Sequence, residues 1–268
     1  MKIHWMSNAP WAATGYGNQT KLFLPRLQKL GHQMSVTAFY GLEGAVLNMN
    51  GINIYPRGFH PYGLDIAAAN ASMENADIII SLIDAWVLNA GQMQLNSMLW
   101  VPWFPIDCEP IPGPVADVVK FAYKRIVFSH HAERMMDQAG LDYYYVPHGI
   151  DTEKLKPRDK AESRKMLGIP ESAYLVGMVA ANKGQPSRKA FCEQIAGFQI
   201  LKQVHKDAVL YLHTYDGNGN QRDAVNLRQY IHGLGLDIGK DVFICNQHQY
   251  MLSYGEEYMA HAFSAMDV

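Results

Sequence analysis

The chain has 268 residues, a formal net charge of −2 at pH 7, 49% hydrophobic residues and 18% charged residues. This length allows one large or two medium domains, and the near-neutral charge excludes a general attraction to nucleic acid or acidic membranes. The three cysteines, Cys108, Cys192 and Cys245, lie far apart without metal-binding spacing, which favours a reducing compartment. Because we find neither a signal peptide nor an apolar run of about 18 residues, we expect a cytoplasmic protein without a transmembrane segment.

The first half of the chain alternates between apolar strand-like segments and helix-like segments. Residues 2–6 predict a strand, residues 7–17 a glycine-containing loop, residues 18–30 a helix and residues 33–39 a second strand. Further strands are expected at residues 52–55, 77–83, 98–104, 125–129 and 143–146, and helices at 64–76, 86–93, 115–122 and 131–139. Near-continuous apolar strands such as 77–83 are typical of a parallel sheet covered on both faces. These elements predict a doubly wound α/β domain.

The same pattern starts again after a polar stretch at residues 151–158, which indicates a linker. We therefore expect two domains, 1–156 and 157–268. The second has predicted helices at 159–167, 188–204, 224–233 and 256–265, and strands at 174–180, 208–213 and 241–244. Residues 266–268 look like the start of another strand. The second domain thus has about half the strands of a complete doubly wound domain, and an exposed sheet edge tends to pair, so we expect self-association.

One loop, residues 184–191, combines glycine, proline and serine with two adjacent cations, Arg188 and Lys189. We predict that these cations open a helix, where free backbone N–H groups and the helix dipole favour an anion. Two cations at such a place suggest a diphosphate. On the pattern alone, an ordinary loop with solvated basic residues is an equally good interpretation.

Four segments, taken with the order of the elements, resemble the GT-B glycosyltransferases, and more narrowly family 4, the glycosyltransferase group 1 type. They are TGYG at 14–17, FPIDCEPIP at 104–112, VPHGID at 146–151 and QPSRK at 185–189. The resemblance implies an α/β fold of two Rossmann-like doubly wound domains facing a cleft, the second one incomplete here. It also implies transfer of a sugar from a UDP- or GDP-type donor to an acceptor hydroxyl, with retained configuration and without a metal or other cofactor.

The chain departs from this family at its end. In the family the corresponding segment continues into a loop whose two glutamates contact the sugar and ribose of the donor, whereas this sequence stops at Val268. We expect either a truncated or a naturally shortened relative. Two alternatives therefore stay open: a non-catalytic nucleotide- or carbohydrate-binding protein, and a GT-B-fold sugar-nucleotide epimerase.

The resemblance assigns donor binding above all to Arg188 and Lys189, which would stabilise the leaving diphosphate. The other donor-side candidates are Gly15, Gly17, Asn182, His213 and Thr214. The two glycines allow close approach of a ligand, or simply form a tight turn; TGYG is not a full GxGxxG, so a nicotinamide site is not expected.

Asp107 is the candidate catalytic residue, because it follows a strand at the edge of the sheet where doubly wound folds bind ligands. It would orient or deprotonate the acceptor hydroxyl, unless it is only a cap in a proline-rich loop. Further candidates near the cleft are Glu109, His130, Asn246 and Gln247. We expect a nucleotide sugar as partner, a carbohydrate, lipid or protein acceptor, and no nucleic acid.

Overall fold

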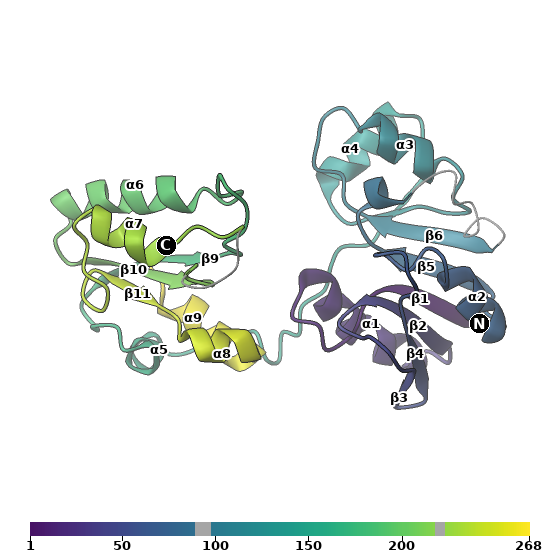
Figure 1. Cartoon of the computed structure of the whole chain (residues 1–268), viewed down its shortest axis with the longest axis horizontal. Coiled ribbons are helices and arrows are strands. Elements are labelled where there is room, and N and C mark those ends of the chain that lie inside the picture. Colours follow the sequence, from purple (N-terminus) through teal and green to yellow (C-terminus); the bar gives the residue numbers. More distant parts are fainter. Residues whose placement is uncertain (89–97, 218–222) are drawn as a thin grey trace. The chain divides into compact units, whose positions relative to one another are not determined.

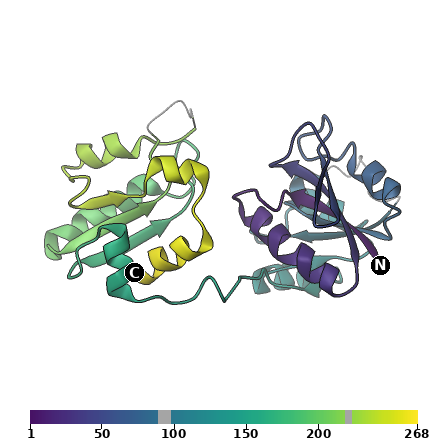
Figure 2. The same cartoon turned by 90° about the horizontal axis from the view of Figure 1, so that it is seen from below.

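The computed structural model describes residues 1–88, 98–217 and 223–268, which form two compact units, Met1–Ile150 and Asp151–Val268. Figures 1 and 2 show each unit as a sheet with helices packed against it. The predicted boundary at residue 156 falls within the second unit. None of the helices in the described ranges has the length and apolarity needed to cross a bilayer.

The first unit contains an eight-stranded sheet in the order β3-β4-β2-β1-β5-β6-β7-β8. All neighbouring strands are parallel except β3 and β4. The strands are β1 (Lys2–Asn8), β2 (Gln33–Tyr40), β3 (Leu47–Met49), β4 (Ile52–Pro56), β5 (Ile78–Leu82), β6 (Leu99–Phe104), β7 (Ile126–Val127) and β8 (Tyr144–Tyr145). The helices are α1 (Gly15–Lys29), α2 (Ala67–Met73), the 3₁₀ helix η1 (Ala85–Val87), α3 (Gly113–Val119) and α4 (His130–Gln138).

Both faces of this sheet are covered, as the apolar strands predict. Trp5 of β1 lies in a buried cluster with Leu24 of α1, whereas its neighbour Met6 lies in another cluster with Ala67 and Ala71 of α2. Successive residues of a strand point to opposite faces, so a strand buried on both faces is apolar at nearly every position.

The structure differs from the prediction at three elements of the first unit. Helix α1 begins at Gly15 rather than at residue 18, because the Thr14 hydroxyl accepts a hydrogen bond from the Gly17 N–H at 2.9 Å and caps the helix. The antiparallel strand β3 was missed, since it has only three residues and is mostly exposed. The helix expected at residues 86–93 is η1 at its start, and its remainder lies outside the described residues apart from Leu88.

The second unit contains a parallel sheet in the order β11-β10-β9. Its strands are β9 (Tyr174–Val179), β10 (Ala208–His213) and β11 (Val242–Ile244), and its helices are α5 (Lys160–Leu167), α6 (Phe191–Val204), α7 (Leu227–Gly233), α8 (Gln247–Leu252) and α9 (Glu256–Ala265). Helices α6 and α7 cover one face of the sheet and α5 and α9 the other (Figure 1). The predicted apolar face of α6, namely Phe191, Ile195 and Phe198, is buried.

The last residues of the chain run beside β9, on the side away from β10. The Asp267 N–H donates to the Leu175 carbonyl at 2.9 Å, and the Gly177 N–H donates to the Val268 carbonyl at 2.7 Å. This part of the β9 edge is therefore already hydrogen-bonded. Self-association through an open sheet edge stays a prediction.

Candidate functional site

The loops that follow β9, β10 and β11 meet at the carboxyl edge of the second sheet, where open α/β sheets bind ligands. Asn182, in the loop after β9, is only 5% exposed. Its side-chain amide donates to the Tyr215 carbonyl at 3.1 Å and to the Val225 carbonyl at 2.7 Å, and its oxygen accepts from the Val225 N–H at 3.2 Å. The predicted donor residue Asn182 therefore joins two loops within the protein.

Thr214 and Gln247 are part of the same hydrogen-bonded group. The Thr214 hydroxyl accepts from the Asn182 N–H at 3.0 Å. Gln247 donates to the carbonyls of Thr214 and Cys245 at 3.0 and 2.9 Å, and its oxygen accepts from the Asp216 N–H at 2.9 Å. The structure thus brings three predicted site residues together, and it uses their polar atoms to shape the loops.

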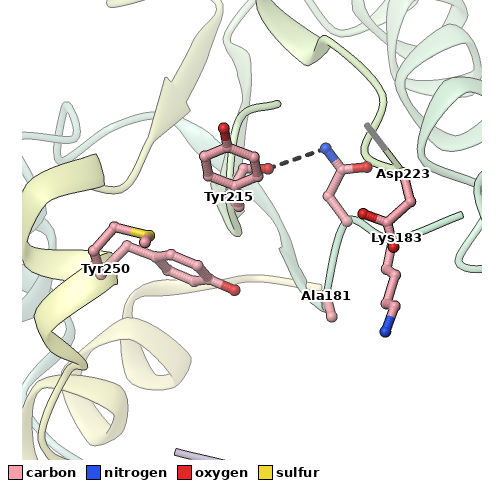
Figure 3. Close-up of a pocket in the computed structure, with 7 residues that line it drawn as sticks. Ala181, Lys183, Tyr215, Asp223 and Tyr250 are labelled. Atoms are coloured by element: carbon pink, nitrogen blue, oxygen red, sulfur yellow. Dashed lines mark hydrogen bonds between the residues drawn. The ribbon is translucent and has the colours of Figure 1, made fainter. Parts of the chain in front are cut away.

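A pocket of about 360 Å³ lies beside this group (Figure 3). Its lining residues come from the loops after β9 and β10 and from α8: Ala181, Asn182, Lys183, Tyr215, Asp223, Tyr250 and Met251. In Figure 3, Tyr250 lies across the pocket from Lys183 and Asp223. Phenol rings, a carboxylate and an ammonium group around one hollow can hold a planar polar ligand that carries negative charge.

Arg188 and Lys189 do not open helix α6, as the sequence had predicted. The helix begins at Phe191, and its N-cap Ala190 has φ 52°, a left-handed conformation that separates the preceding turns from the helix. Both cations lie in these turns, close to the pocket, because the Arg188 N–H donates to the Lys183 carbonyl at 3.2 Å. They are exposed and do not line the pocket.

Lys183, which was not among the donor-side candidates predicted from the sequence, is exposed and also lines the pocket. Within the ranges that the structure describes, the side chains of Lys183, Arg188 and Lys189 have no hydrogen-bond or ion-pair partner. Three cations thus share one loop without a direct ion pair to the described residues, and the Asp223 carboxylate lines the same pocket as Lys183.

His213, at the end of β10, is almost buried among tyrosines. Its Nδ1 lies 3.1 Å from the Tyr211 hydroxyl, and its ring lies 4.9 Å from that of Tyr254 and 5.8 Å from that of Tyr250. Burial lowers the pKa of His213, so the imidazole is neutral at pH 7. It supports the wall of the pocket through Tyr250 and does not line it.

The sequence missed most of the pocket wall. Tyr250 and Met251 lie on α8, a six-residue helix that was not predicted. Its N-cap is Asn246, whose side chain accepts from the Gln249 N–H at 2.9 Å. The sequence signal for this helix was Asn246 itself, because Asn is a preferred N-cap residue and the six residues after it are compatible with a helix.

In the first unit, Gly15 and Gly17 lie in the first turn of α1. A Cβ atom at Gly17 would lie 2.2 Å from the Ala12 carbonyl oxygen, whereas a Cβ at Gly15 would meet nothing within 4 Å. Gly17 is therefore required for close packing of the loop after β1, and only Gly15 leaves open space.

Asp107 follows β6 and is exposed. It lies near Tyr16, whose hydroxyl donates to Asp84 Oδ1 at 3.0 Å. Burial, followed by the charges of Asp84 and Asp107, raises the pKa of Tyr16. The structure thus places the charge of Asp107 near the Tyr16–Asp84 pair, which the sequence had not singled out.

His130 and Glu109 are the remaining candidates of the first unit. His130 is exposed, its Nδ1 lies 2.5 Å from Glu133 Oε2, and its ring stacks on Tyr145 at 4.7 Å. Glu109 is exposed in the loop after β6. No cluster of three or more His, Cys, Asp or Glu side chains suited to a metal occurs among the residues that could be searched, which are the described ones.

Comparison with solved structures finds similar chains at low sequence identity. The first is Anabaena Alr3699/HepE in complex with UDP-glucose, with a TM-score of 0.64 and 17% identity over 100% of this chain and 72% of that one. The second is WaaG, a glycosyltransferase involved in lipopolysaccharide biosynthesis, with a TM-score of 0.63 and 12% identity over 100% of this chain and 74% of that one. This chain has the GT-B fold.

The UDP-GlcNAc 2-epimerase from Methanocaldococcus jannaschii is also similar, with a TM-score of 0.57 and 9% identity over 97% of this chain and 76% of that one. No protein-family model matches the sequence, and no curated protein matches it either. At these identities the likeness establishes the fold, and the narrower resemblance to family 4 stays a prediction.

Proposed function

We propose that this chain binds a nucleotide-diphosphate sugar and transfers the sugar to an acceptor hydroxyl. The observation that carries the proposal is the pocket at the carboxyl edge of the second sheet, beside a loop with three cations, Lys183, Arg188 and Lys189, that lack ion-pair partners among the described residues. The GT-B fold supports it, since HepE was solved with UDP-glucose, and for the same reason we propose a UDP-type donor.

The chemical task of the cations is to stabilise the diphosphate as it leaves. Negative charge grows on the phosphate oxygens when the glycosidic bond breaks, and fixed cations at that place lower the barrier more than they stabilise the bound donor. The proposal uses these side chains in place of a metal ion. The motif resemblance is the support for the finer proposal that the anomeric configuration is retained.

On the acceptor side we propose that Asp107 orients or deprotonates the attacking hydroxyl. Its support is its place directly after β6, at the carboxyl edge of the first sheet, and its proximity to the Tyr16–Asp84 pair. A carboxylate in this position accepts a hydrogen bond from a sugar hydroxyl and takes up its proton.

The donor site is tested by calorimetric titration of the chain with UDP and with GDP. The double variant Arg188→Ala/Lys189→Ala is expected to bind at least about tenfold more weakly, because charge-assisted hydrogen bonds contribute about 1.5–3 kcal/mol each. The matched control is Lys206→Ala/Lys240→Ala, which removes the same charge from residues that precede β10 and β11, at the opposite edge of the sheet. Absence of binding by the unmodified chain, or equal weakening by the control, would overturn the proposal.

The second candidate is a sugar-nucleotide epimerase, because UDP-GlcNAc 2-epimerases share the fold. The two are separated by NMR of UDP-GlcNAc incubated with the chain without any acceptor. A change in the configuration of the nucleotide-bound sugar would identify an epimerase. Binding of the nucleotide with neither epimerisation nor transfer would identify a binding protein.

A further inference from the structure

Four aromatic side chains are exposed along the carboxyl edge of the first sheet, and we call them the aromatic edge. Trp11 follows β1 and is 45% exposed, Tyr40 ends β2 and is 59% exposed, and Trp86 follows β5 and is 64% exposed, while Phe59, after β4, is fully exposed. Singly exposed rings are common on protein surfaces, but four exposed rings in loops at one edge of a sheet form a candidate surface for a ligand.

The loops that carry these rings are neighbours in the fold. Their strands are adjacent in the order β4-β2-β1-β5, and all four are parallel. The Trp11 indole N–H donates to the Gly41 carbonyl at 2.6 Å, which joins the loop after β1 to the loop after β2. An ion pair of 3.1 Å between Arg57 and Glu43 joins the loops after β4 and β2.

The same edge is acidic. Asp84 and Asp107 lie in the loops after β5 and β6, and Asp65 lies in the loop after β4. Among the described residues of these loops, the only Lys or Arg is Arg57, which is paired with Glu43. Negative charge repels anionic lipid headgroups, whereas carboxylates are strong acceptors for hydroxyl hydrogens.

We propose that the aromatic edge binds neutral sugar units, so that the acceptor is an uncharged oligosaccharide. The C–H groups of a sugar ring carry partial positive charge and pack on the negative face of an aromatic ring, while the hydroxyl groups at the ring edge donate to the neighbouring carboxylates. Several sugar rings in a row match several aromatic rings along one sheet edge. The inference rests on the proposed function in that it names the acceptor of the transfer reaction.

The test is binding of the full chain to an array of neutral and acidic glycans, with phosphatidylcholine and phosphatidylglycerol vesicles as separate probes. We expect binding to neutral oligosaccharides. Trp11→Ala and Trp86→Ala are each expected to weaken it about tenfold, the equivalent of one aromatic contact of about 1–1.5 kcal/mol. Trp86 is included because it is exposed and its side chain makes no hydrogen bond to the described residues, so we expect its removal to leave the fold intact. Circular dichroism checks the fold of both variants.

The matched control is Phe121→Ala/Tyr123→Ala. These rings are 50% and 55% exposed, but they precede β7 and so lie at the opposite edge of the sheet. The inference would be overturned if the control lost as much binding as the Trp variants. It would also be overturned if the chain bound only acidic glycans or vesicles, or bound no glycan at all.

Failure of this inference can be told apart from failure of the proposed function by titrating the same variants with UDP. UDP binding without glycan binding contradicts the carbohydrate acceptor and leaves the donor site standing. Glycan binding without UDP binding contradicts the proposed transferase and leaves a carbohydrate-binding surface.

Discussion

At the scale of single residues, the side chains around the pocket differ in whether the protein already uses their polar atoms. Asn182 uses both amide hydrogens and its oxygen in hydrogen bonds between loops, whereas the side chains of Arg188 and Lys189 have no partner among the described residues. The sequence placed all three on the donor side, with Asn182 as the weaker candidate, because residue type does not reveal which polar atoms are satisfied.

The substitution Asn182→Asp is expected to destabilise the second unit by about 3 kcal/mol, since a buried carboxylate would face two carbonyl oxygens instead of donating to them. Denaturation followed by far-ultraviolet circular dichroism measures this. The control Asn246→Asp should change the unfolding free energy by less than about 0.5 kcal/mol, because Asp caps a helix as well as Asn does. Equal effects of the two substitutions would show that the hydrogen bonds of Asn182 are not what matters.

His4 makes the first unit sensitive to acid. Its ring nitrogens lie 2.8 Å from Ser35 Oγ and 2.7 Å from Thr37 Oγ1, and burial lowers its pKa from 6.5 to about 4. Between these values the unfolded chain binds a proton that the folded unit does not. The stability of the first unit should therefore fall as the pH drops from about 6.5 to 4, by up to about 1.4 kcal/mol per pH unit. Denaturation series at several pH values would show this slope, and His4→Gln should flatten it; an unchanged slope would assign the effect to other groups.

At the scale of elements, α1 shows that two glycines in one motif have different roles. Gly17→Ala is expected to destabilise the first unit by about 2 kcal/mol or more, because the new methyl group would overlap the Ala12 carbonyl. Gly15→Ala meets no atoms and should stabilise the helix by up to about 1 kcal/mol. Tryptophan fluorescence during denaturation measures both. Destabilisation by Gly15→Ala would contradict the structure at this turn.

Asp267 links the end of the chain to two elements of the second unit, α5 and β9. Its carboxylate pairs with Lys160 and Arg164 of α5 and accepts from the Leu175 N–H of β9 at 2.7 Å. Burial alone would raise its pKa, but the Lys160 and Leu175 hydrogen bonds and the charge of Arg164 outweigh burial and lower the pKa of Asp267. Because the pKa of Asp267 is lower in the folded state, its charged carboxylate stabilises the fold at pH values above its unfolded-state pKa of about 3.9. This stabilisation is lost as the pH falls through the folded-state pKa.

Replacing Asp267 by Ala should cost about 3 kcal/mol at pH 7, because it leaves the buried Arg164 without its partner carboxylate. This cost should become smaller in acid, where Asp267 is protonated in both the folded and the unfolded chain. Asp237→Asn, which breaks the exposed 3.7 Å pair with Lys240, is the control and should cost less than about 0.5 kcal/mol. An equal cost at pH 2 and pH 7 would exclude an electrostatic origin.

At the scale of the whole molecule, the two units have separate cores and should unfold separately. All five tryptophans lie in the first unit, so fluorescence follows that unit alone, whereas circular dichroism follows both. We expect the two signals to have different midpoints, with Asn182→Asp moving the circular dichroism transition and leaving the fluorescence transition in place. A shift of both transitions would show that the units are energetically coupled.

Sequence reasoning went furthest where local chemistry decides structure. The alternation of apolar strands with amphipathic helices predicted two α/β units and the parallel sheets, and this was confirmed because burial on both faces requires apolar residues at almost every strand position. It failed for short elements. Strand β3 and helix α8 have three and six residues, too few for a periodic signal.

The sequence by itself determined the fold class, the restart of the pattern after the polar linker, and the placing of a basic glycine-containing loop directly after a strand. Tertiary structure alone decided that Arg188 and Lys189 precede α6 rather than open it, that Asn182 and Gln247 bond loops together, and that Tyr250 lines the pocket. The physical reason is the separation along the chain of the residues that interact. Burial and strand pattern follow from neighbours in the chain, whereas the partner of a polar side chain lies tens of residues away and is set only when the loops meet.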